Sequence, residues 1–149
     1  MLTVTGSPMV PFVDALKTAL TADTGVTALI STRLYGGFPR GARTSYPYVV
    51  RGRRSMTDGG GAMQLEGGDV SVQIDTWSQA NGPYEASNIL ANVRRVLQRS
   101  NPPVKGFALV QGSLHCTLEE VFDEPDPDMP EQQLYHGVQA WTAMVEERL

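Results

Sequence analysis

The segment from Asp69 to Ser78 constrains the fold more than any other part of the chain. Its residues alternate strictly between two sets, Val70, Val72, Ile74 and Thr76 on one side and Ser71, Gln73, Asp75 and Trp77 on the other. Because successive side chains of a strand point to opposite faces, the first set lies on a core face and the second on a mostly polar face. The segment therefore predicts a strand in a sheet that is buried on one side.

Two main helices are expected to cover that face. From Ser7 to Asp23 the apolar residues recur at helical spacing, and Gly25 is a natural stop. Val26 to Ile30 is expected to add a further helical turn. Pro83 suits the first turn of the second helix, whose buried stripe is expected to be Ala86, Ile89, Leu90, Val93, Val96 and Leu97.

Three more strands are expected, from Tyr46 to Arg53, from about Phe107 to Phe122 and from about Gln133 to Glu146. Residues 55–68 contain five glycines and no apolar periodicity, so they are expected to form a flexible loop. Residues 123–131 are acidic and rich in proline, which is typical of a loop.

The expected order of elements is helix, strand, strand, helix, strand, strand. It predicts one α+β domain over residues 1–149, with an antiparallel or mixed four-stranded sheet and two main helices packed on one face. A small barrel is the alternative. Cys116 is the only cysteine, which excludes an internal disulfide and a cysteine-based zinc site. No apolar run approaches the ~18 residues of a membrane span, so no membrane partner is expected.

The residues that most resemble catalytic groups do not form a site. His115 and Cys116 are adjacent on an expected strand, so they point to opposite faces. We interpret Cys116 as a small core residue and His136 as a buried or interfacial histidine. No catalytic residue is expected, and the sequence does not predict an enzyme.

Two further motifs fail on spacing. Gly61 is followed by Ala62 rather than by the Lys and Ser or Thr of a phosphate-binding loop. Asp126 and Asp128 have the first spacing of a calcium loop, but Glu131 stands where that loop requires glycine. No cofactor is expected, and at most a weak surface cation site remains.

The formal charges are strongly segregated along the chain, although they sum to only −4. Between Arg33 and Thr57 there are six arginines and no acid, a basic block consisting of Arg33, Arg40, Arg43, Arg51, Arg53 and Arg54. Between Glu119 and Glu131 there are seven acids and no base, an acidic block consisting of Glu119, Glu120, Asp123, Glu124, Asp126, Asp128 and Glu131. The small net charge therefore conceals a polarised molecule.

The basic block has three interpretations. It is a solvated strand face, a surface for nucleic-acid phosphates, or a surface that docks on an acidic partner. Complementary patches on opposite sides of one chain favour head-to-tail association, and such a contact gives a ring when its rotation closes. Self-assembly is the sharper hypothesis, and pairing of the two blocks within one subunit would contradict it.

The order of several short motifs resembles a known family. The motifs are Leu16 to Leu20, Arg33-Leu34-Tyr35, Pro39, Tyr46-Pro-Tyr-Val-Val50, Val72-Gln-Ile-Asp-Thr-Trp-Ser78, and the helix with Glu85-Ala86, Ile89, Val93 and Leu97. In this order they resemble the tail-completion or tail-terminator proteins of long-tailed bacteriophages and of related prophage or gene-transfer particles. The resemblance covers the first two-thirds of the chain and continues more loosely into the last two strands.

This resemblance implies a structural virion protein of the tail or neck, assembled in the host cytoplasm. Such an α+β subunit forms a ring, typically a hexamer, that caps the head-proximal end of the tail tube. The implied partners are further copies of the chain, the tail tube protein and a head-completion or stopper protein. DNA passes through the channel without sequence-specific binding, and the family needs no cofactor.

We expect the ring contacts to join the two charged blocks of neighbouring subunits. The expected interface residues are Arg51, Arg53 and Arg54 on one side and Glu119, Glu120, Asp123 and Glu124 on the other. The alternatives are another neck component, such as a head-completion or stopper protein, and a nucleic-acid-binding module that uses the block from Arg33 to Arg54.

Overall fold

The structure is a computed structural model that describes residues 7–37, 45–58, 67–126 and 131–147. Its elements in chain order are α1 (Met9–Thr21), α2 (Thr24–Ile30), β1 (Leu34–Tyr35), β2 (Tyr48–Asp58), β3 (Gly67–Ser78), α3 (Tyr84–Leu97), β4 (Phe107–Leu109), β5 (His115–Pro125) and β6 (Gln133–Glu147). The α+β class is confirmed. The expected four-stranded sheet and element order are wrong, because the described residues form six strands and three helices.

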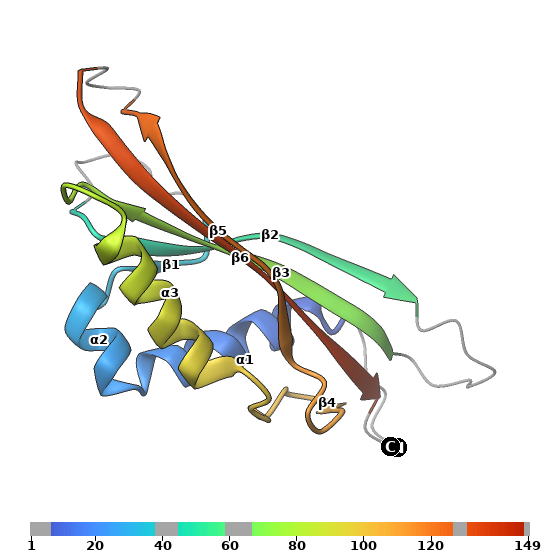
Figure 1. Ribbon diagram of the computed structural model, residues 1–149. Coiled ribbons are helices and arrows are strands. Elements are labelled where there is room, and N and C mark those ends of the chain that lie inside the picture. The colour runs from blue at the N-terminus through green and yellow to red at the C-terminus, as the bar shows by residue number, and fades with distance from the viewer. Residues whose placement is uncertain (1–6, 38–44, 59–66, 127–130, 148–149) are drawn as a thin grey trace.

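The six strands form one twisted sheet with the order β1-β2-β3-β6-β4, and β5 also pairs with β6. The short β1 runs parallel to β2, and all the other pairs are antiparallel. The three helices lie against one face of the sheet, and the strand pairs extend beyond them at both ends (Figure 1). We call the other face the outer face.

The structure corrects three expected boundaries. The strand expected from Phe107 to Phe122 is divided into β4 and β5, with Gly112 between them at a φ of 77°, a conformation that interrupts a strand. Residues 55–58, expected in a loop, pair with β3, and residues 123–125 pair with β6. Backbone pairing at a hairpin end needs no apolar alternation, so the sequence pattern missed these pairs. Residues 59–66 and 127–130 lie outside the described residues.

The core fills the space between the helices and the sheet. Trp141 of β6 is fully buried there, and Phe12 and Leu16 of α1 pack in the same cluster with Ile89 and Val93 of α3. The sheet contributes Val70, Val72 and Ile74 to this cluster. The alternation of β3 and the helical stripe of α3 are thereby confirmed, including Val96, which packs partly buried against the core.

Gly137 of β6 allows α3 to approach the sheet closely. A Cβ atom at this position would lie 2.8 Å from Cδ1 of Leu90 and 3.2 Å from its Cγ. Leu90 is itself fully buried and has little room to move. The absence of a side chain at Gly137 therefore sets the distance between α3 and β6.

A larger residue at this position should destabilise the fold. We expect Gly137→Val to lower the free energy of unfolding by about 1–3 kcal/mol, because overpacking forces the helix away from the sheet. Gly37→Val is the control, since no atom of the described residues lies within 4 Å of a Cβ there, and its effect should stay within about 0.5 kcal/mol. Urea unfolding measures both, and equal effects of the two substitutions would contradict the role of the close approach.

Asp23 joins two of the helices. Its carboxylate accepts a hydrogen bond from the backbone N–H of Val26 at 3.0 Å and so caps α2. Both oxygens also accept from Arg95 of α3, at 2.6 and 3.1 Å. The hydrogen bond from Arg95, followed by that from Val26, lowers the pKa of Asp23. A single carboxylate thus both begins α2 and fastens it to α3.

The lowered pKa gives the stability a dependence on pH. A carboxylate with a depressed pKa in the folded state stabilises the fold above its ordinary value of 3.8, and this contribution is lost as the pH falls through the folded-state pKa. We expect Asp23→Asn, which keeps a capping side chain, to be less stable than the parent at pH 7. The difference should vanish near pH 2, and a difference that persists there in thermal unfolding would contradict the charge-based explanation.

Candidate functional site

The candidate site is built from described members of the two charged blocks, on two strands at opposite sides of the sheet. The arginines at 51, 53 and 54 lie on β2, and the acids from Glu119 to Glu124 lie on β5. β3 and β6 separate these two strands. Within the described residues, no ion pair joins one block to the other. The arginines of β2 and the acids of β5 are therefore kept apart within the described part of the subunit.

Arg51 lies in the interior of the subunit and not at its surface. Its side chain is only 8% exposed, and it donates from Nη1 to the carbonyl of Val13 at 3.2 Å. The same nitrogen lies 3.5 Å from the carboxylate of Asp14 on α1. Burial lowers the pKa of Arg51, and the nearby Asp14 opposes that shift. Arg51 therefore fastens β2 to α1 and is removed from the expected interface set.

The remaining arginines differ in the hydrogen bonds that their side chains make within the subunit. Arg54 donates to the carbonyls of Gly36 and Arg51, each at 3.1 Å, and Arg33 donates to the carbonyl of Pro47 at 2.7 Å. Arg53 is exposed and has no ion pair with a described residue. Arg40 and Arg43 lie outside the described residues. Much of the basic block thus organises the region around β1 and β2, and Arg53 is its most accessible member.

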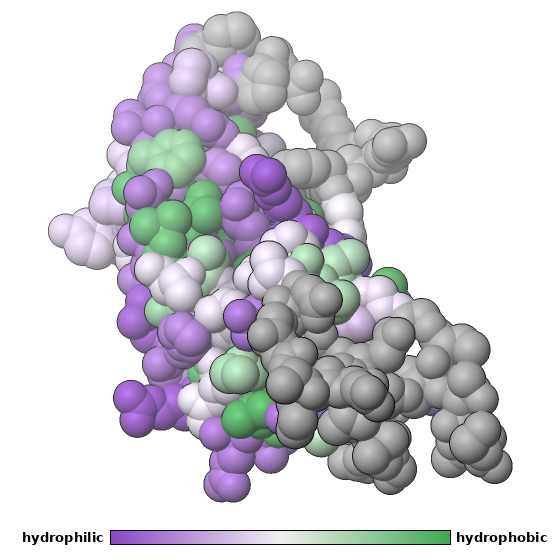
Figure 2. Space-filling view, turned by 90° about the vertical axis from the view of Figure 1, so that its right-hand side faces the viewer, coloured by the Kyte–Doolittle hydropathy of each residue, from purple (hydrophilic) through white to green (hydrophobic). Residues whose placement is uncertain are grey.

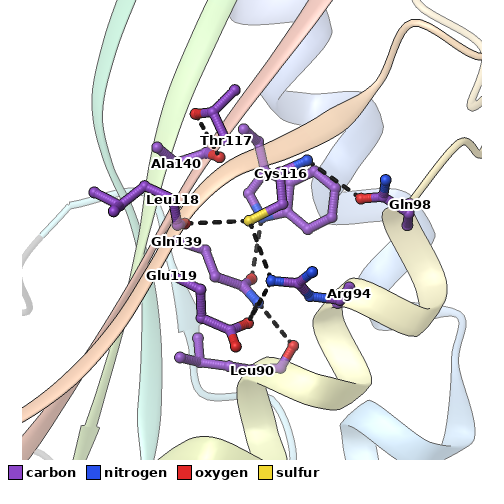
Figure 3. Close-up of polar contacts among 10 residues, drawn as sticks. Leu90, Arg94, Gln98, Cys116, Thr117, Leu118, Glu119, Gln139 and Ala140 are labelled. Atoms are coloured by element: carbon purple, nitrogen blue, oxygen red, sulfur yellow. Dashed lines mark hydrogen bonds and ion pairs between the residues drawn. The ribbon is translucent and has the colours of Figure 1, made fainter.

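Glu119 is exposed but held by a polar network between α3 and the sheet (Figure 3). Its Oε1 accepts from Arg94 of α3 at 3.1 Å and from Nε2 of Gln139 at 2.6 Å. Gln139 is fully buried, donates to the carbonyl of Leu90 at 2.9 Å, and accepts from the indole N–H of Trp141 at 3.0 Å. Because every polar atom of Gln139 is bound, the network fixes β5 against α3.

The acids farther along β5 remain available. Glu120 and Asp123 are exposed and have no ion pair with a described residue. Glu124 is about one-third exposed, and its Oε1 lies 3.6 Å from Nδ1 of His136. Asp126 is buried and Glu131 is exposed, while Asp128 lies outside the described residues. Glu120 and Asp123 are therefore the acidic counterparts of Arg53.

The outer face of the sheet carries a row of rings that the sequence pattern did not reveal. Tyr48 stacks on Trp77, and Trp77 stacks on His136 with ring centres 3.8 Å apart. His136 also lies 4.9 Å from the ring of Phe122 and 2.7 Å from Oδ1 of the buried Asp75. The row crosses β2, β3, β6 and β5. We interpret His136 from the sequence as a buried or interfacial histidine; its side chain is 13% exposed, and its contact with Asp75 links β6 to β3.

The groups considered for catalysis stay apart. His115 and Cys116 pair with successive residues of β6 and so lie on opposite faces of the sheet. Burial raises the pKa of the Cys116 thiol, which opposes formation of the reactive thiolate. Among the residues that the structure describes, no three histidine, cysteine or acidic side chains gather to hold a metal ion. No helix in the described ranges has both the length and the apolar character needed to cross a membrane.

The fold is that of a small α+β subunit with three helices on one face of a twisted sheet. It is similar to a chain in the structure described as "Virion of native gene transfer agent (GTA) particle", with a TM-score of 0.74 and 21% sequence identity. The likeness covers 89% of this chain and 92% of that one. A comparison with curated proteins finds no significant match.

The family is shown by a match over most of the sequence. Residues 14–146 match the family model described as "Tail completion protein gp17". The chain belongs to this family of tail completion proteins and is therefore a structural component of a phage-like virion. The resemblance noted from the short sequence motifs is confirmed.

The different environments of Arg51 and Arg53 can be tested by truncation. We expect Arg51→Ala to lower the free energy of unfolding by about 1–3 kcal/mol, because the buried stem and the link to α1 are lost. Arg53→Ala should change it by no more than about 0.5 kcal/mol. Asp14→Ala should cost below about 1 kcal/mol, since that carboxylate is largely exposed. Urea denaturation of the three variants measures these values, and a stable Arg51→Ala variant would contradict the interior role.

Proposed function

We propose that this tail completion protein is the ring-forming terminator of the tail tube. In this proposal several copies, six in the typical ring, close around the head-proximal end of the tube and stop its growth. The opposite side of the ring docks the head-completion or stopper protein, and DNA passes through the central channel without sequence-specific contacts. No catalysis and no cofactor belong to this function.

The observation that carries the proposal is the separation of unpaired charge onto opposite edges of one sheet. Arg53 on one edge and Glu120 and Asp123 on the other make no ion pair within the described part of the subunit. A contact between different patches of two identical chains is head-to-tail, and repetition of such a contact closes a ring when the rotation allows it. Family membership supports a place for such a ring in a phage-like particle.

The proposed contact set is narrower than the sequence alone suggested. Arg53 and Arg54 face Glu120, Asp123 and Glu124 of the next subunit in this proposal. Arg51 and Glu119 are left out of this set, because they make contacts inside the subunit. Arg51 fastens β2 to α1, and Glu119 fastens β5 to α3. The charged contacts steer association and fix its direction more than they raise its affinity.

Two other functions can be distinguished from this one by experiment. A head-completion or stopper protein would bind the portal side of the head and not the tube. A nucleic-acid-binding module would bind DNA as a free subunit, with an affinity that falls steeply with salt. The second is less well supported, because Arg33, Arg51 and Arg54 are engaged with backbone carbonyls of the same chain.

The decisive experiment adds the purified protein to the tail tube protein of the same particle. We expect substoichiometric protein to stop tube growth and to appear as a ring at one end of each tube in negative-stain electron microscopy. The reason is that a ring bound at the growing end removes the surface to which the next tube subunits add. Unchanged tube lengths and bare tube ends would contradict the proposal, and binding to heads instead would favour a stopper.

A further inference from the structure

β5 leaves one of its two edges open. It pairs with β6 along one edge from His115 to Pro125, and no described strand lies on its other edge. Its N-terminal part is occupied from the helix side, because the N–H of Cys116 donates to Gln98 at 3.2 Å. From Leu118 onward the strand runs away from the helices toward the end of the hairpin (Figure 1). The eight residues from Leu118 to Pro125 therefore form an open edge.

β2 leaves the opposite edge of the sheet open over a similar length. β1 covers only Val49 and Val50 by pairing with them. No described strand pairs with the outer edge of β2 from Arg51 to Asp58, which is also eight residues. At about 3.4 Å per residue, each open segment is roughly 27 Å long. Among the described residues, the sheet thus has two strand segments of equal length, one at each side, that pair with no further strand.

An open strand edge is a template for pairing with another chain, and proteins control it with charge. Two β5 edges brought together would oppose Glu120 and Asp123 of one copy to the same acids of the other. Two β2 edges would likewise oppose arginines. Like charges directly opposite in a sheet are destabilising, whereas opposite charges stabilise it. The charge pattern therefore disfavours both self-pairings and favours β5 against β2.

We propose that β5 of one copy pairs through its backbone with the segment from Arg51 to Asp58 of β2 in the next copy, so that one sheet continues from subunit to subunit. This inference rests on the proposed ring and specifies its contact. Within a subunit β2 and β5 run in opposite directions, because each of the three strand pairings between them is antiparallel. A rotation about an axis along the strands preserves these directions, so the new pair is antiparallel.

Opposite residues of an antiparallel pair point to the same face of the sheet, which sets the register. The segments overlap almost fully with their faces matched when Phe122 stands opposite Ser55 and Glu120 opposite Thr57. Asp123 then stands opposite Arg54 and beside Arg53. Asp123 and Arg53 are an exposed acid and an exposed base that lack ion pairs with described residues. Pro125, which has no N–H to donate, then stands at the end of the new ladder, where proline is tolerated.

Apolar exposure supports the same contact. Leu118 and Phe122 of β5 are 46% and 40% exposed on the outer face, and an adjoining strand would cover part of both. The face drawn in Figure 2 is mostly hydrophilic, and its hydrophobic residues form small, separate areas. Strand pairing needs no broad apolar patch, because the backbone hydrogen bonds provide the contact.

Amide hydrogen exchange tests the strand pairing directly. We compare the free subunit at low concentration with the ring, either free or bound to tube ends. Pairing predicts that the amides of residues 118–124 that face away from β6 exchange at least about tenfold more slowly in the ring. The same slowing should appear in β2 beyond Arg51. Rings in which both segments exchange as fast as in the free subunit would overturn this inference and leave the proposed function intact.

Charge reversal tests the register. We expect Arg53→Glu and Asp123→Arg each to weaken self-association about fivefold or more per contact, and the double variant to restore it. Lys17→Glu is the matched control, because Lys17 is exposed and lies on α1, outside the two strands proposed to pair. Loss of assembly in the double variant, while Lys17→Glu assembles normally, would overturn the contact between Arg53 and Asp123. Absence of rings in the parent protein, even with tube protein present, would instead contradict the proposed function.

Discussion

The pairing of β3 with β6 is the constraint on which the rest of the molecule depends. The two strands pair without interruption over twelve positions at the centre of the sheet. Their inward side chains, from Val70 on β3 to Trp141 on β6, supply the surface against which α1 and α3 pack. A shift of one residue in this pairing would turn the apolar set of one strand toward water. The register of two strands therefore fixes the positions of α1 and α3, and α2 is held in turn by these two helices.

Buried polar side chains complete the packing on both faces of the sheet. Arg51 binds α1, Gln139 binds α3, and Asp75 binds His136 across the outer face. Each of these residues lies on a strand and contacts a neighbouring element. A buried polar group is costly without partners, so each of these groups favours one arrangement of its neighbours. The interior polar contacts thereby hold β2 and β5, the strands that carry the charged blocks.

The spacing of apolar residues predicted the helices and strands that bury one face in the core. It missed the segments that bury no such face. The alternation in β3, the stripe of α3 and the position of β6 follow from one face packing on a core. The two residues of β1 and the outer ends of β2 and β5 show no such pattern, because backbone pairing alone places them. Charge counts located the two blocks on the chain, but only packing against α1 showed that Arg51 is interior.

The location of both open edges on one polypeptide has a genetic consequence. In the proposed ring every contact between subunits joins the β5 edge of one copy to the β2 edge of an identical copy. One substitution in either edge is therefore present at every contact of the ring. An altered edge can be compensated only by a second change in the same gene. When two particles whose edge charges do not match infect one cell, mixed rings would contain defective contacts. A variant of this kind would then act dominantly over the parent protein. In that proposal, distinct edge charges would keep the subunits of different particles in one host from forming mixed rings.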